Sequence, residues 1–525
     1  MSTADADAPA GDEGAGAAAK GAGAAPEAGP QPAPPKKRGL REYVADNIIV
    51  LLAMLLNKLR GIVTLPLIVG TIGTAGYGLW SQLIAYVTFL AVVLSWNLHL
   101  PLIRFIAADR RSAPRVFSTI LLLEMGLVVA GGLLLLPFSG LASDALLGDA
   151  RLGRHLAVGL VMVFFTNIRL INLNVYRAYD RFLARSVVEL AASSIELAII
   201  IVVLVLTHDL LLALVGMTVW AACVAAFSTW HAGRLTGIGR PSKDVARRAL
   251  AYAVPLLPAL LSFWVLDRSN RFFIGHFLGQ KEVGVFSASY AIGSMSIYAQ
   301  MPFQMTLFPK VAALWDTDRA TAKRYIELSN KFYLTLSIPF TVACVVVAPR
   351  ALEKLGNAEI AAQSAILTVL VALGFLLYGV SVMQAQVLHG ARRTGVQGGV
   401  SVVAAVLNVA LNVLLIPRIG LVGSAIATAL SYGATCFMLA SVARKHLAIS
   451  YYPAYLARCV VASLVMLAPM AALLPHGTWG LVAALFAGAA TYFAALVLLR
   501  AFDAQEIDLA KRALRKLRGG RVTSR

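Results

Sequence analysis

Residues 397–417, QGGVSVVAAVLNVALNVLLIP, and residues 420–441, GLVGSAIATALSYGATCFMLAS, are two long apolar runs that follow each other almost without interruption. Arg418, in the joint between them, is the only charged residue of the stretch. Each run has about the 20 residues that a helix needs to cross the hydrocarbon core of a bilayer. The apolar character is continuous and does not alternate, as it would in the strands of a membrane barrel. The pattern therefore predicts a pair of transmembrane helices.

Runs of the same kind recur along most of the chain. Hydrophobic residues make up 59% of the sequence and charged residues 14%, and the mean hydropathy is +0.76, unlike an ordinary water-soluble domain. The runs cover residues 45–69, 77–98, 115–137, 155–175, 187–206, 210–231, 250–275, 283–309, 328–349, 362–388, 397–417, 420–441, 454–475 and 477–499. We therefore predict an all-α integral membrane protein with about 14 transmembrane helices.

Basic residues gather in alternate joints between these runs. Residues 1–41 are predicted to form a disordered tail, rich in Ala, Gly and Pro, which ends in a basic cluster before the first run. Lys and Arg also dominate the joints near Arg111, Arg247, Arg324 and Arg444, whereas the intervening joints have few. The positive-inside rule then predicts that both termini are cytoplasmic. This topology explains most of the formal net charge of +20, so nucleic acid is not an expected partner.

The last segment, residues 501–525, combines basic residues with apolar ones at helical spacing. Ile507, Leu514 and Leu517 share one face among several Lys and Arg residues. Such a helix could lie on an anionic membrane surface. A solvated basic tail is the equally weighted alternative.

The sequence lacks the usual signals of metal, disulfide or nucleotide chemistry. The four cysteines, Cys223, Cys344, Cys436 and Cys459, sit singly in predicted spans, without metal-ligand spacing. We interpret them as small apolar residues of the packed helices. No phosphate-binding Gly-x-x-x-x-Gly-Lys-Ser/Thr loop occurs. We therefore expect no metal and no cofactor, and no ATP-driven pumping by this chain alone.

Polar and charged residues interrupt two of the predicted spans. They are Asn57, Lys58 and Arg60 in the first span, and Asp267, Arg268 and Arg271 in the seventh. Ionisable groups at membrane depth usually face a protein interior or a water-filled cavity, so we predict that these residues bind substrate. Asp267 and Arg271 are four residues apart and could pair on the helix surface. Arg268 and Arg271 lie near the outer end of the seventh span, so the alternative is that their side chains extend to the membrane–water interface.

Three further ionisable residues are weaker candidates. Arg169 could contact substrate, although its position near the inner membrane face also suits a topological anchor. Glu124 and Glu196 could carry a coupling ion such as a proton or sodium. Each carboxylate could instead merely neutralise a nearby arginine.

Two parts of the sequence resemble each other. Arg60 is followed by Gly70, Gly73 and Gly78-Leu79-Trp80-Ser81, and Arg271 is followed by Gly275, Gly279 and Gly284-Val285-Phe286-Ser287. This similarity indicates two halves of about six helices, as in transporters built from parallel repeats. We assign an N-terminal lobe to residues 42–235, a C-terminal lobe to residues 245–448 and two extra helices to residues 449–500.

Two segments also resemble a known family. They are Asp267-Arg268-Ser269-Asn270-Arg271 with Phe277-Leu278-Gly279 and Val283 to Ala288, and Leu407-Asn408 with Asn412, Ile416-Pro417, Gly420 and Gly423 to Thr428. They are similar to polysaccharide biosynthesis flippases, the oligosaccharidyl-lipid branch of the multidrug, oligosaccharidyl-lipid and polysaccharide exporter superfamily. The second segment is the more specific, and the resemblance covers about residues 42–450.

The resemblance implies an architecture and a substrate. It implies two six-helix lobes around a V-shaped cavity and an alternating-access mechanism. The implied substrate is a polyprenyl-diphosphate-linked oligosaccharide, moved from the cytoplasmic to the periplasmic leaflet of a bacterial inner membrane for a surface polysaccharide such as O-antigen. Membrane lipid, polysaccharide polymerases and glycosyltransferases are the corresponding partners.

Three other functions compete with this interpretation. A lipid II flippase fits because that relative also has two spans beyond the common twelve. An ion-coupled multidrug exporter of organic cations would be expected to favour acidic cavity groups, whereas the groups here are net basic. A polymerase or ligase of sugar chains usually needs a large periplasmic loop, and no predicted outside loop is long enough. We therefore expect a transporter and not an enzyme.

Overall fold

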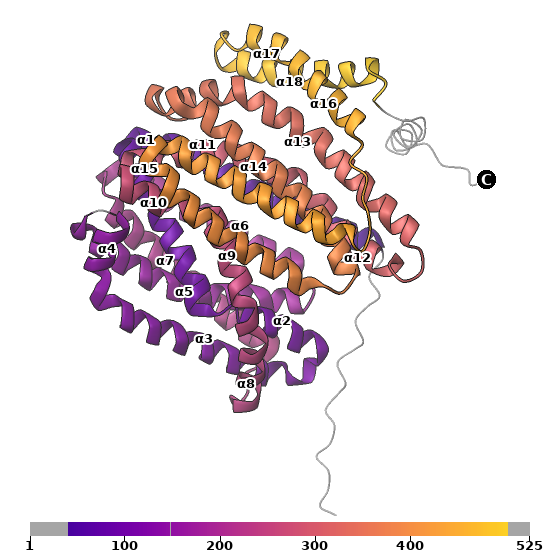
Figure 1. The fold of residues 1–525 in the computed structure, drawn as a ribbon. Helices are drawn as coiled ribbons and strands as arrows, with labels where there is room; N and C mark the ends of the chain where they lie inside the picture. Colours follow the sequence, from indigo (N-terminus) through magenta and orange to yellow (C-terminus); the bar gives the residue numbers. More distant parts are fainter. Residues whose placement is uncertain (1–39, 148, 502–525) are drawn as a thin grey trace, which may run out of the picture. The chain divides into compact units, whose positions relative to one another are not determined.

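The computed structural model describes residues 40–147 and 149–501 of the 525-residue chain, with backbone only for 40–60, 62, 145, 146, 302 and 305 (Figure 1). The predicted N-terminal tail, except for its last two residues, and the C-terminal segment after residue 501 lie outside this range. The chain divides into two units, residues 1–47 and 48–525. Of the first unit, only the opening turns of the first helix are described. All contacts below lie within the second unit.

The described residues form helices and short 3-10 turns, with no strand. The α-helices are α1 (Leu40–Ser95), α2 (His99–Ala108), α3 (Ala113–Leu135), α4 (Ser139–Leu147), α5 (Gly153–Ala178), α6 (Phe182–Thr207), α7 (Leu210–Thr236), α8 (Lys243–Ala253), α9 (Leu257–Arg268), α10 (Asn270–Leu278), α11 (Gln280–Gly293), α12 (Met301–Leu314), α13 (Arg319–Leu355), α14 (Ala358–Gly390), α15 (Thr394–Arg444), α16 (Pro453–Val465), α17 (Leu467–Leu473) and α18 (Gly477–Leu498). This confirms the all-α prediction.

Eleven helical stretches of the described residues are long and apolar enough to cross a membrane, fewer than the roughly 14 predicted from runs of this length. The difference has three local causes. The first predicted span, 45–69, falls mostly on residues without described side chains. Predicted spans 397–417 and 420–441 are joined in α15. Predicted span 283–309 is divided into α11, a 3-10 turn and α12.

Two of the long helices contain a break in the backbone. In α1, Gly73 leaves the helical conformation with φ 75° and ψ 178°. In α15, Ile419 and Gly420 do so, Gly420 with φ 62° and ψ −144°. Positive φ is open to glycine because it has no Cβ. The break in α15 lies where the sequence predicts the joint between two spans.

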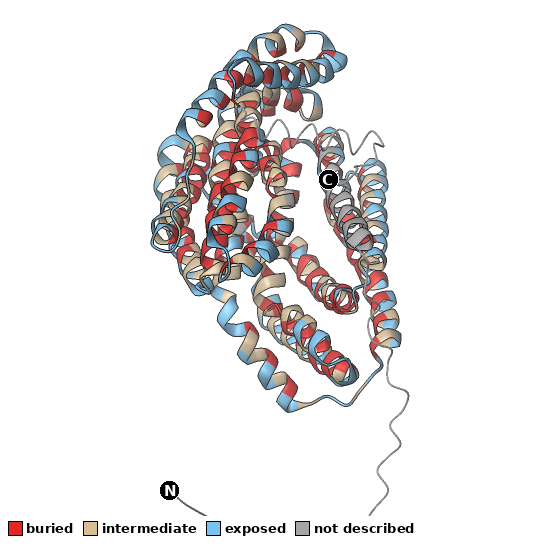
Figure 2. Cartoon of the chain, turned by 90° about the vertical axis from the view of Figure 1, so that its right-hand side faces the viewer, coloured by how far each residue is buried: buried red, intermediate tan, exposed pale blue. Residues whose placement is uncertain are grey.

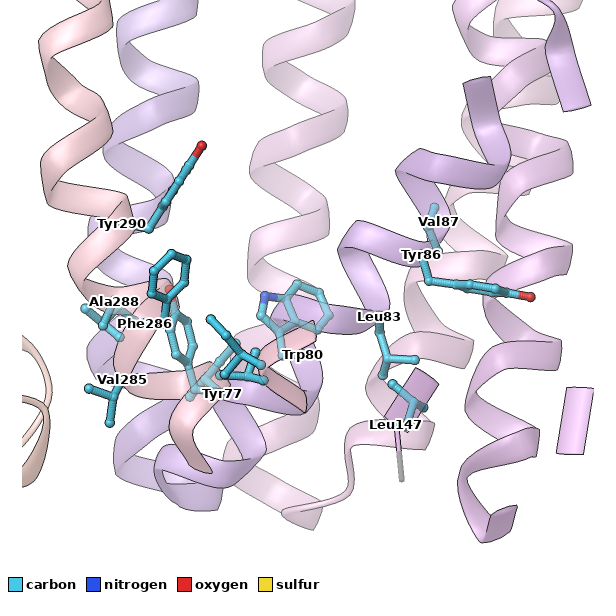
Figure 3. Close-up of a cluster of buried hydrophobic side chains, with 14 of the residues drawn as sticks. Tyr77, Trp80, Leu83, Tyr86, Val87, Leu147, Val285, Phe286, Ala288 and Tyr290 are labelled. Carbon is cyan, nitrogen blue, oxygen red and sulfur yellow. The ribbon is translucent and has the colours of Figure 1, made fainter. Parts of the chain in front are cut away.

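The helices bury the sides on which they meet and expose apolar side chains elsewhere. In Figure 2, buried residues line the faces between helices, and exposed residues cover many outward faces. Leu206, Phe437 and Phe486 are large apolar residues with 74–75% of their surface exposed. Exposed apolar side chains and internally satisfied backbone are what a lipid solvent requires. The largest buried cluster combines residues of α1 and α11, among them Tyr77, Trp80 and Phe286 (Figure 3).

Helices α16 to α18 pack against α13 through a polar seam. Glu327, Lys331 and Thr335 follow each other at four-residue spacing on α13 and so share one face. The Glu327 carboxylate accepts a hydrogen bond from the backbone of Ser450 (2.7 Å), and the Lys331 ammonium lies 4.4 Å from the Tyr455 ring centroid. The hydroxyls of Thr335 and Tyr455 are 2.5 Å apart. These contacts fix the position of α16 along α13.

Candidate functional site

The charged residues of the seventh predicted span meet where α9 ends and α10 begins. The Asp267 carboxylate accepts hydrogen bonds from the Tyr290 hydroxyl of α11 (2.7 Å) and from Arg268 Nε (3.1 Å). Arg271 is only 9% exposed and donates from Nη1 to the backbone carbonyl of Asp267 (3.3 Å). Its guanidinium lies 4.8 Å from the centroid of the Tyr290 ring. Tyr290 thus contacts Asp267 and Arg271, Arg268 joins through Asp267, and the two guanidinium groups and one carboxylate leave the cluster net positive.

The pairing inside this cluster differs from the sequence prediction. Asp267 pairs with its neighbour Arg268 and not with Arg271, four residues away. Arg271 turns to the face of Tyr290, where a guanidinium is attracted by the ring. The expectation of an i, i+4 pair takes only residues of one helix into account, whereas Tyr290, which contacts both Asp267 and Arg271, belongs to α11.

Residues of α1 bind the same junction from the other half of the chain. Gln82 donates from Nε2 to the backbone carbonyl of Arg271 (2.8 Å). A Cβ atom at Gly275 would lie 2.0 Å from that Gln82 nitrogen, so only glycine permits this approach. The Trp264 indole donates to the Thr88 hydroxyl (3.2 Å). The position of Arg271 is thus set by α1 as well as by α11.

A chain of buried amides fastens α10 to both segments of α15. Asn270 donates from Nδ2 to the Thr428 hydroxyl (2.8 Å), and its Oδ1 accepts from Asn412 Nδ2 (3.3 Å). Asn412 Nδ2 also lies 3.1 Å from Asn408 Oδ1, and Asn412 Oδ1 accepts from the Ser424 hydroxyl (2.9 Å). All five residues are fully buried. The segment that carries the more specific family resemblance therefore holds the seventh predicted span in place.

Two glycines give α1 and the α10–α11 junction the same backbone shape. Gly73 has φ 75° and ψ 178°, and Gly279 has φ 95° and ψ 174°. Each precedes the segment that carries the glycine-aromatic motif noted in the sequence. These backbone angles are strained for any residue with a Cβ. The pair therefore matches in conformation as well as in sequence.

The two motif glycines contact each other's segments reciprocally. A Cβ at Gly78 would lie 1.9 Å from the carbonyl oxygen of Gln280, and a Cβ at Gly284 would lie 2.2 Å from the carbonyl oxygen of Thr74. The same 206-residue offset relates Thr74 to Gln280, Gly78 to Gly284 and Gly73 to Gly279. Each of the two segments therefore makes the same contact to the other, as expected for a local two-fold arrangement.

Side-chain hydrogen bonds close the same end of the molecule. Asn357, which caps α14, donates from Nδ2 to the Thr74 hydroxyl (2.9 Å). Gln280 donates from Nε2 to the backbone carbonyl of Leu147 in α4 (2.8 Å). These bonds join segments 283 and 133 residues apart in sequence, so they tie the two halves of the chain together.

The other predicted site residues lie outside this cluster or outside the described side chains. Asn57, Lys58 and Arg60 belong to α1, but their side chains lie among those not described. Among the described residues, no hydrogen bond or ion pair joins Arg169 or Glu124 to the Asp267 cluster.

Each of the three weaker candidates occupies a different helix. Arg169 is half-buried on α5, and its side chain has no hydrogen bond or ion pair to a described residue. Glu196 is half-buried on α6. Glu124 is 1% exposed on α3, and its Oε2 has no hydrogen-bond partner among the described residues. Of these, Glu124 is the group whose charge the surroundings accommodate least.

The described residues contain no group of three or more His, Cys, Asp or Glu side chains arranged to hold a metal ion. All four cysteines are unpaired thiols. The site chemistry found in this part of the chain consists of guanidinium, carboxylate, phenol and amide groups. Of these groups, the guanidinium can bind an anion through charge-assisted hydrogen bonds.

The fold is shared with solved membrane transporters. It resembles the lipid II flippase MurJ in its inward closed conformation over 87% of this chain and 99% of that chain, with a TM-score of 0.66 and 13% sequence identity. It also resembles a multidrug resistance MATE family transporter of the MOP superfamily in an inward-facing conformation, with a TM-score of 0.57 and 15% identity over 76% of this chain and 97% of that chain. The chain is thus a multi-pass helical membrane protein with this transporter fold.

The family follows from the sequence match. Residues 44–315, just over half of the chain, match the family described as polysaccharide biosynthesis protein, and the chain belongs to that family. The "probable low-salt glycan biosynthesis flippase Agl15" of Haloferax volcanii is 25% identical over 233 residues, which is 44% of this chain and 49% of that relative. The chain therefore matches about half the length of this curated relative. The family resemblance seen in the sequence is confirmed.

Proposed function

We propose that this protein is a flippase for a polyprenyl-diphosphate-linked oligosaccharide, which it moves from the cytoplasmic to the periplasmic leaflet of a bacterial inner membrane. The observation that carries the proposal is the basic cluster of Asp267, Arg268 and Arg271 in a member of the polysaccharide biosynthesis family. The glycan would serve surface polysaccharide synthesis, beside glycosyltransferases and a polymerase.

The chemistry of the substrate explains why arginines would line its path. A diphosphate loses hydration when it enters a protein inside a membrane, and charge-assisted hydrogen bonds offset that loss. The planar guanidinium presents a fork of donors that matches phosphate oxygens. Arg268 is 36% exposed and so remains accessible, whereas Arg271 is buried. We assign direct contact to Arg268 and a positioning role to Arg271.

Three residues of α1 complete the proposed binding site. Asn57, Lys58 and Arg60 would contribute polar and basic groups of the first lobe to diphosphate binding. Arg169 would add a further cation from α5. The net positive charge of this set favours an anionic substrate over an organic cation, which is the substrate that a multidrug exporter of that type would need.

We further propose the domain plan and helix count predicted from the sequence. Residues 42–235 and 245–448 would form two six-helix lobes, with two extra helices in residues 449–500, giving 14 spans. The common 206-residue offset of Gly73 and Gly279, and their matching backbone angles, support a repeat. The breaks inside α1 and α15 support counting each as two spans.

The reciprocal glycine contact supports an alternating-access mechanism. Gly78 and Gly284 lie far along the chain from the basic joints that the positive-inside rule assigns to the cytoplasm. Their contact would therefore close the periplasmic end and leave this state facing inward. Transport would require the two lobes to separate at this contact and to close at the other end.

Glu124 is our candidate for ion coupling, with Glu196 as the second. A buried carboxyl oxygen without a partner is costly when charged, and binding a proton or a cation removes that cost. Binding of such an ion in one of the inward- and outward-facing states, and its release in the other, would give the transport cycle its direction.

A lipid II flippase remains the second candidate. It is favoured by the similarity to MurJ, which extends over 99% of that structure, and by the docking of α16 to α18 on α13. Lipid II also presents a polyprenyl diphosphate, so the same arginines would serve it. The two candidates therefore differ in the sugar and not in the headgroup chemistry.

Translocation in proteoliposomes tests the proposal. The full chain should move a fluorescent polyprenyl-diphosphate oligosaccharide across the bilayer, and Arg60→Ala or Arg268→Ala should slow it roughly 10- to 150-fold, as expected for a lost charge-assisted contact. Arg418→Ala, which removes an exposed arginine elsewhere, is the matched control and should retain the rate. Transport of lipid II alone would select the second candidate. Transport of neither substrate would overturn the flippase proposal.

A further inference from the structure

An exposed aromatic-basic patch lies where α7 leads into the connector to α8, residues 237–242. We call Trp230, Arg234, Ile238 and Arg240 the connector patch. The Arg234 guanidinium lies 4.9 Å from the centroid of the Trp230 ring, and Trp230 is 55% exposed. Ile238 is 84% exposed and lies next to Gly233 of the same helix end. Water would not favour so exposed an isoleucine, whereas a membrane interface would.

The backbone under this patch is fixed. Gly239 donates its N–H to the Ser118 hydroxyl of α3 (3.1 Å), and Ser242 donates to the Thr119 hydroxyl (3.0 Å). A Cβ at Gly239 would lie 2.8 Å from the backbone nitrogen of Arg115, so the connector lies directly on α3. Ile238 and Arg240 are therefore presented from a defined place.

An apolar stripe leads along α7 to the patch. Val219, Cys223, Phe227 and Trp230 are all exposed, and their spacing of four, four and three residues puts them on one face of the helix. Arg234 continues the same face one turn beyond Trp230. This face of α7 thus changes from apolar to basic between Trp230 and Arg234. A phospholipid has the same order, with an apolar acyl chain next to a charged headgroup.

The arginines of the patch carry unpaired charge. Arg234 and Arg240 are exposed, and neither forms an ion pair with a described residue. The nearest acidic residue along the chain, Asp244, is already paired with Arg248 of α8 (2.8 Å). An anion that approaches the patch would therefore find two guanidinium groups without a local competitor.

We propose that the connector patch binds the headgroup of an anionic phospholipid, with its acyl chain along the apolar stripe of α7. Arg234 and Arg240 would bind the phosphate through charge-assisted hydrogen bonds, and Trp230 would lie at the level of the headgroup. Ile238 would insert beside the lipid. This site is separate from the Asp267 cluster, so the inference does not depend on the transported substrate.

Fluorescence quenching of the purified full chain in detergent tests the site. Phosphatidylglycerol with brominated acyl chains should quench tryptophan emission at a lower concentration than brominated phosphatidylcholine. In the double variant Arg234→Gln, Arg240→Gln, half-maximal quenching by phosphatidylglycerol should need roughly 30-fold more lipid, because each basic residue near an anionic surface contributes roughly fivefold. Trp230→Phe should remove the part of the signal that distinguishes the two lipids.

Three comparisons decide the result. Arg234→Lys, Arg240→Lys keeps the charges and should retain most of the preference, which also guards against a folding defect in the glutamine variant. Arg418→Gln removes an arginine elsewhere and should leave the preference unchanged. An unchanged preference in the glutamine variant would overturn the proposal. Inorganic phosphate that abolishes the quenching at concentrations similar to the lipid would overturn it too, by showing a site for the free anion.

Discussion

Tyr290 is the residue on which the charged cluster depends. Its hydroxyl donates to Asp267, and its ring faces the guanidinium of Arg271, so one side chain contacts both signs of charge. In Figure 3 the hydroxyl points away from the apolar cluster formed with Phe286. A tyrosine is suited to this place because its body is apolar and its tip is polar. Removal of the hydroxyl would leave the half-buried Asp267 carboxylate with one donor fewer.

A double-mutant cycle measures this contact. We expect Tyr290→Phe and Asp267→Asn to be coupled by about 1.5–3 kcal/mol in thermal unfolding of the detergent-solubilised protein, the range for hydrogen bonds to charged groups. Tyr86→Phe is the matched control, because Tyr86 is also mostly buried but its hydroxyl makes no hydrogen bond to a described residue, and it should show no coupling to Asp267→Asn. Additive effects of Tyr290→Phe and Asp267→Asn would contradict the assignment.

Asn412 gives a second test at this scale. Asn412→Leu keeps the approximate volume but leaves the polar groups of Asn270, Asn408 and Ser424 without their partner, and each unsatisfied buried group costs about 1–3 kcal/mol. We therefore expect a lower melting temperature by several degrees. Val413→Leu, on the exposed side of the same turn, should change stability by less than about 0.5 kcal/mol. Equal melting temperatures for both variants would show that the amide chain adds no stability.

The site could be predicted from the sequence only in part, for a physical reason. Charged residues in an apolar run are conspicuous, so Asp267, Arg268 and Arg271 were identifiable. Their partners Tyr290 and Gln82 look like ordinary residues of an apolar span, and only the packing of α11 and α1 against α9 and α10 brings them together. Asparagines spaced four apart within an apolar run gave a usable signal for the buried amide chain.

At the scale of helices, the glycines of α1 and α11 set how closely the two halves approach. Backbone carbonyls occupy the space that a Cβ would take at Gly78 and Gly284, and backbone cannot move aside as a side chain can. The contact is therefore sensitive to a single methyl group.

Alanine at these positions should weaken the contact. In a cysteine-free background with Thr74→Cys and Asn357→Cys, a short thiol cross-linker should join the two residues efficiently. We expect Gly78→Ala or Gly284→Ala to lower the yield severalfold, because the added Cβ would overlap backbone and force the segments apart. Gly70→Ala is the control, since nothing lies within 4 Å of its added Cβ. The same yield in all four proteins would refute a tight glycine contact.

Helix boundaries could be predicted where an apolar run is uninterrupted and ends at charged residues or glycine. The joint near Arg418 was visible as a charge and a glycine, and the structure breaks α15 there. Predicted span 250–275 proved to be several helices, because Pro255 lies in a 3-10 turn, Pro258 is in the first turn of α9, and the chain is interrupted again at Ser269. Hydropathy measures length and polarity, so it does not register such local breaks.

For the whole molecule, the positive-inside rule makes the most direct prediction. Single cysteines placed beside Arg111, Arg247, Arg324 and Arg444 should be protected from a membrane-impermeant thiol reagent added to intact cells, because these joints are predicted to be cytoplasmic. The same cysteines should react once the membrane is permeabilised. A cysteine beside Arg418 should react from outside in both conditions. Labelling beside Arg247 in intact cells would show that the topology is wrong.

In the proposed transport cycle, the two halves of the chain must separate at the contact between Thr74, Gly78, Gln280 and Gly284. Locking that contact in the proteoliposome assay tests this requirement most directly. With Thr74→Cys and Asn357→Cys joined by a cleavable cross-linker, we predict that translocation of the polyprenyl-diphosphate oligosaccharide stops, and that it resumes at the original rate when the linker is cleaved. Translocation at the unlinked rate while the cross-link is complete would show that transport does not require this contact to open.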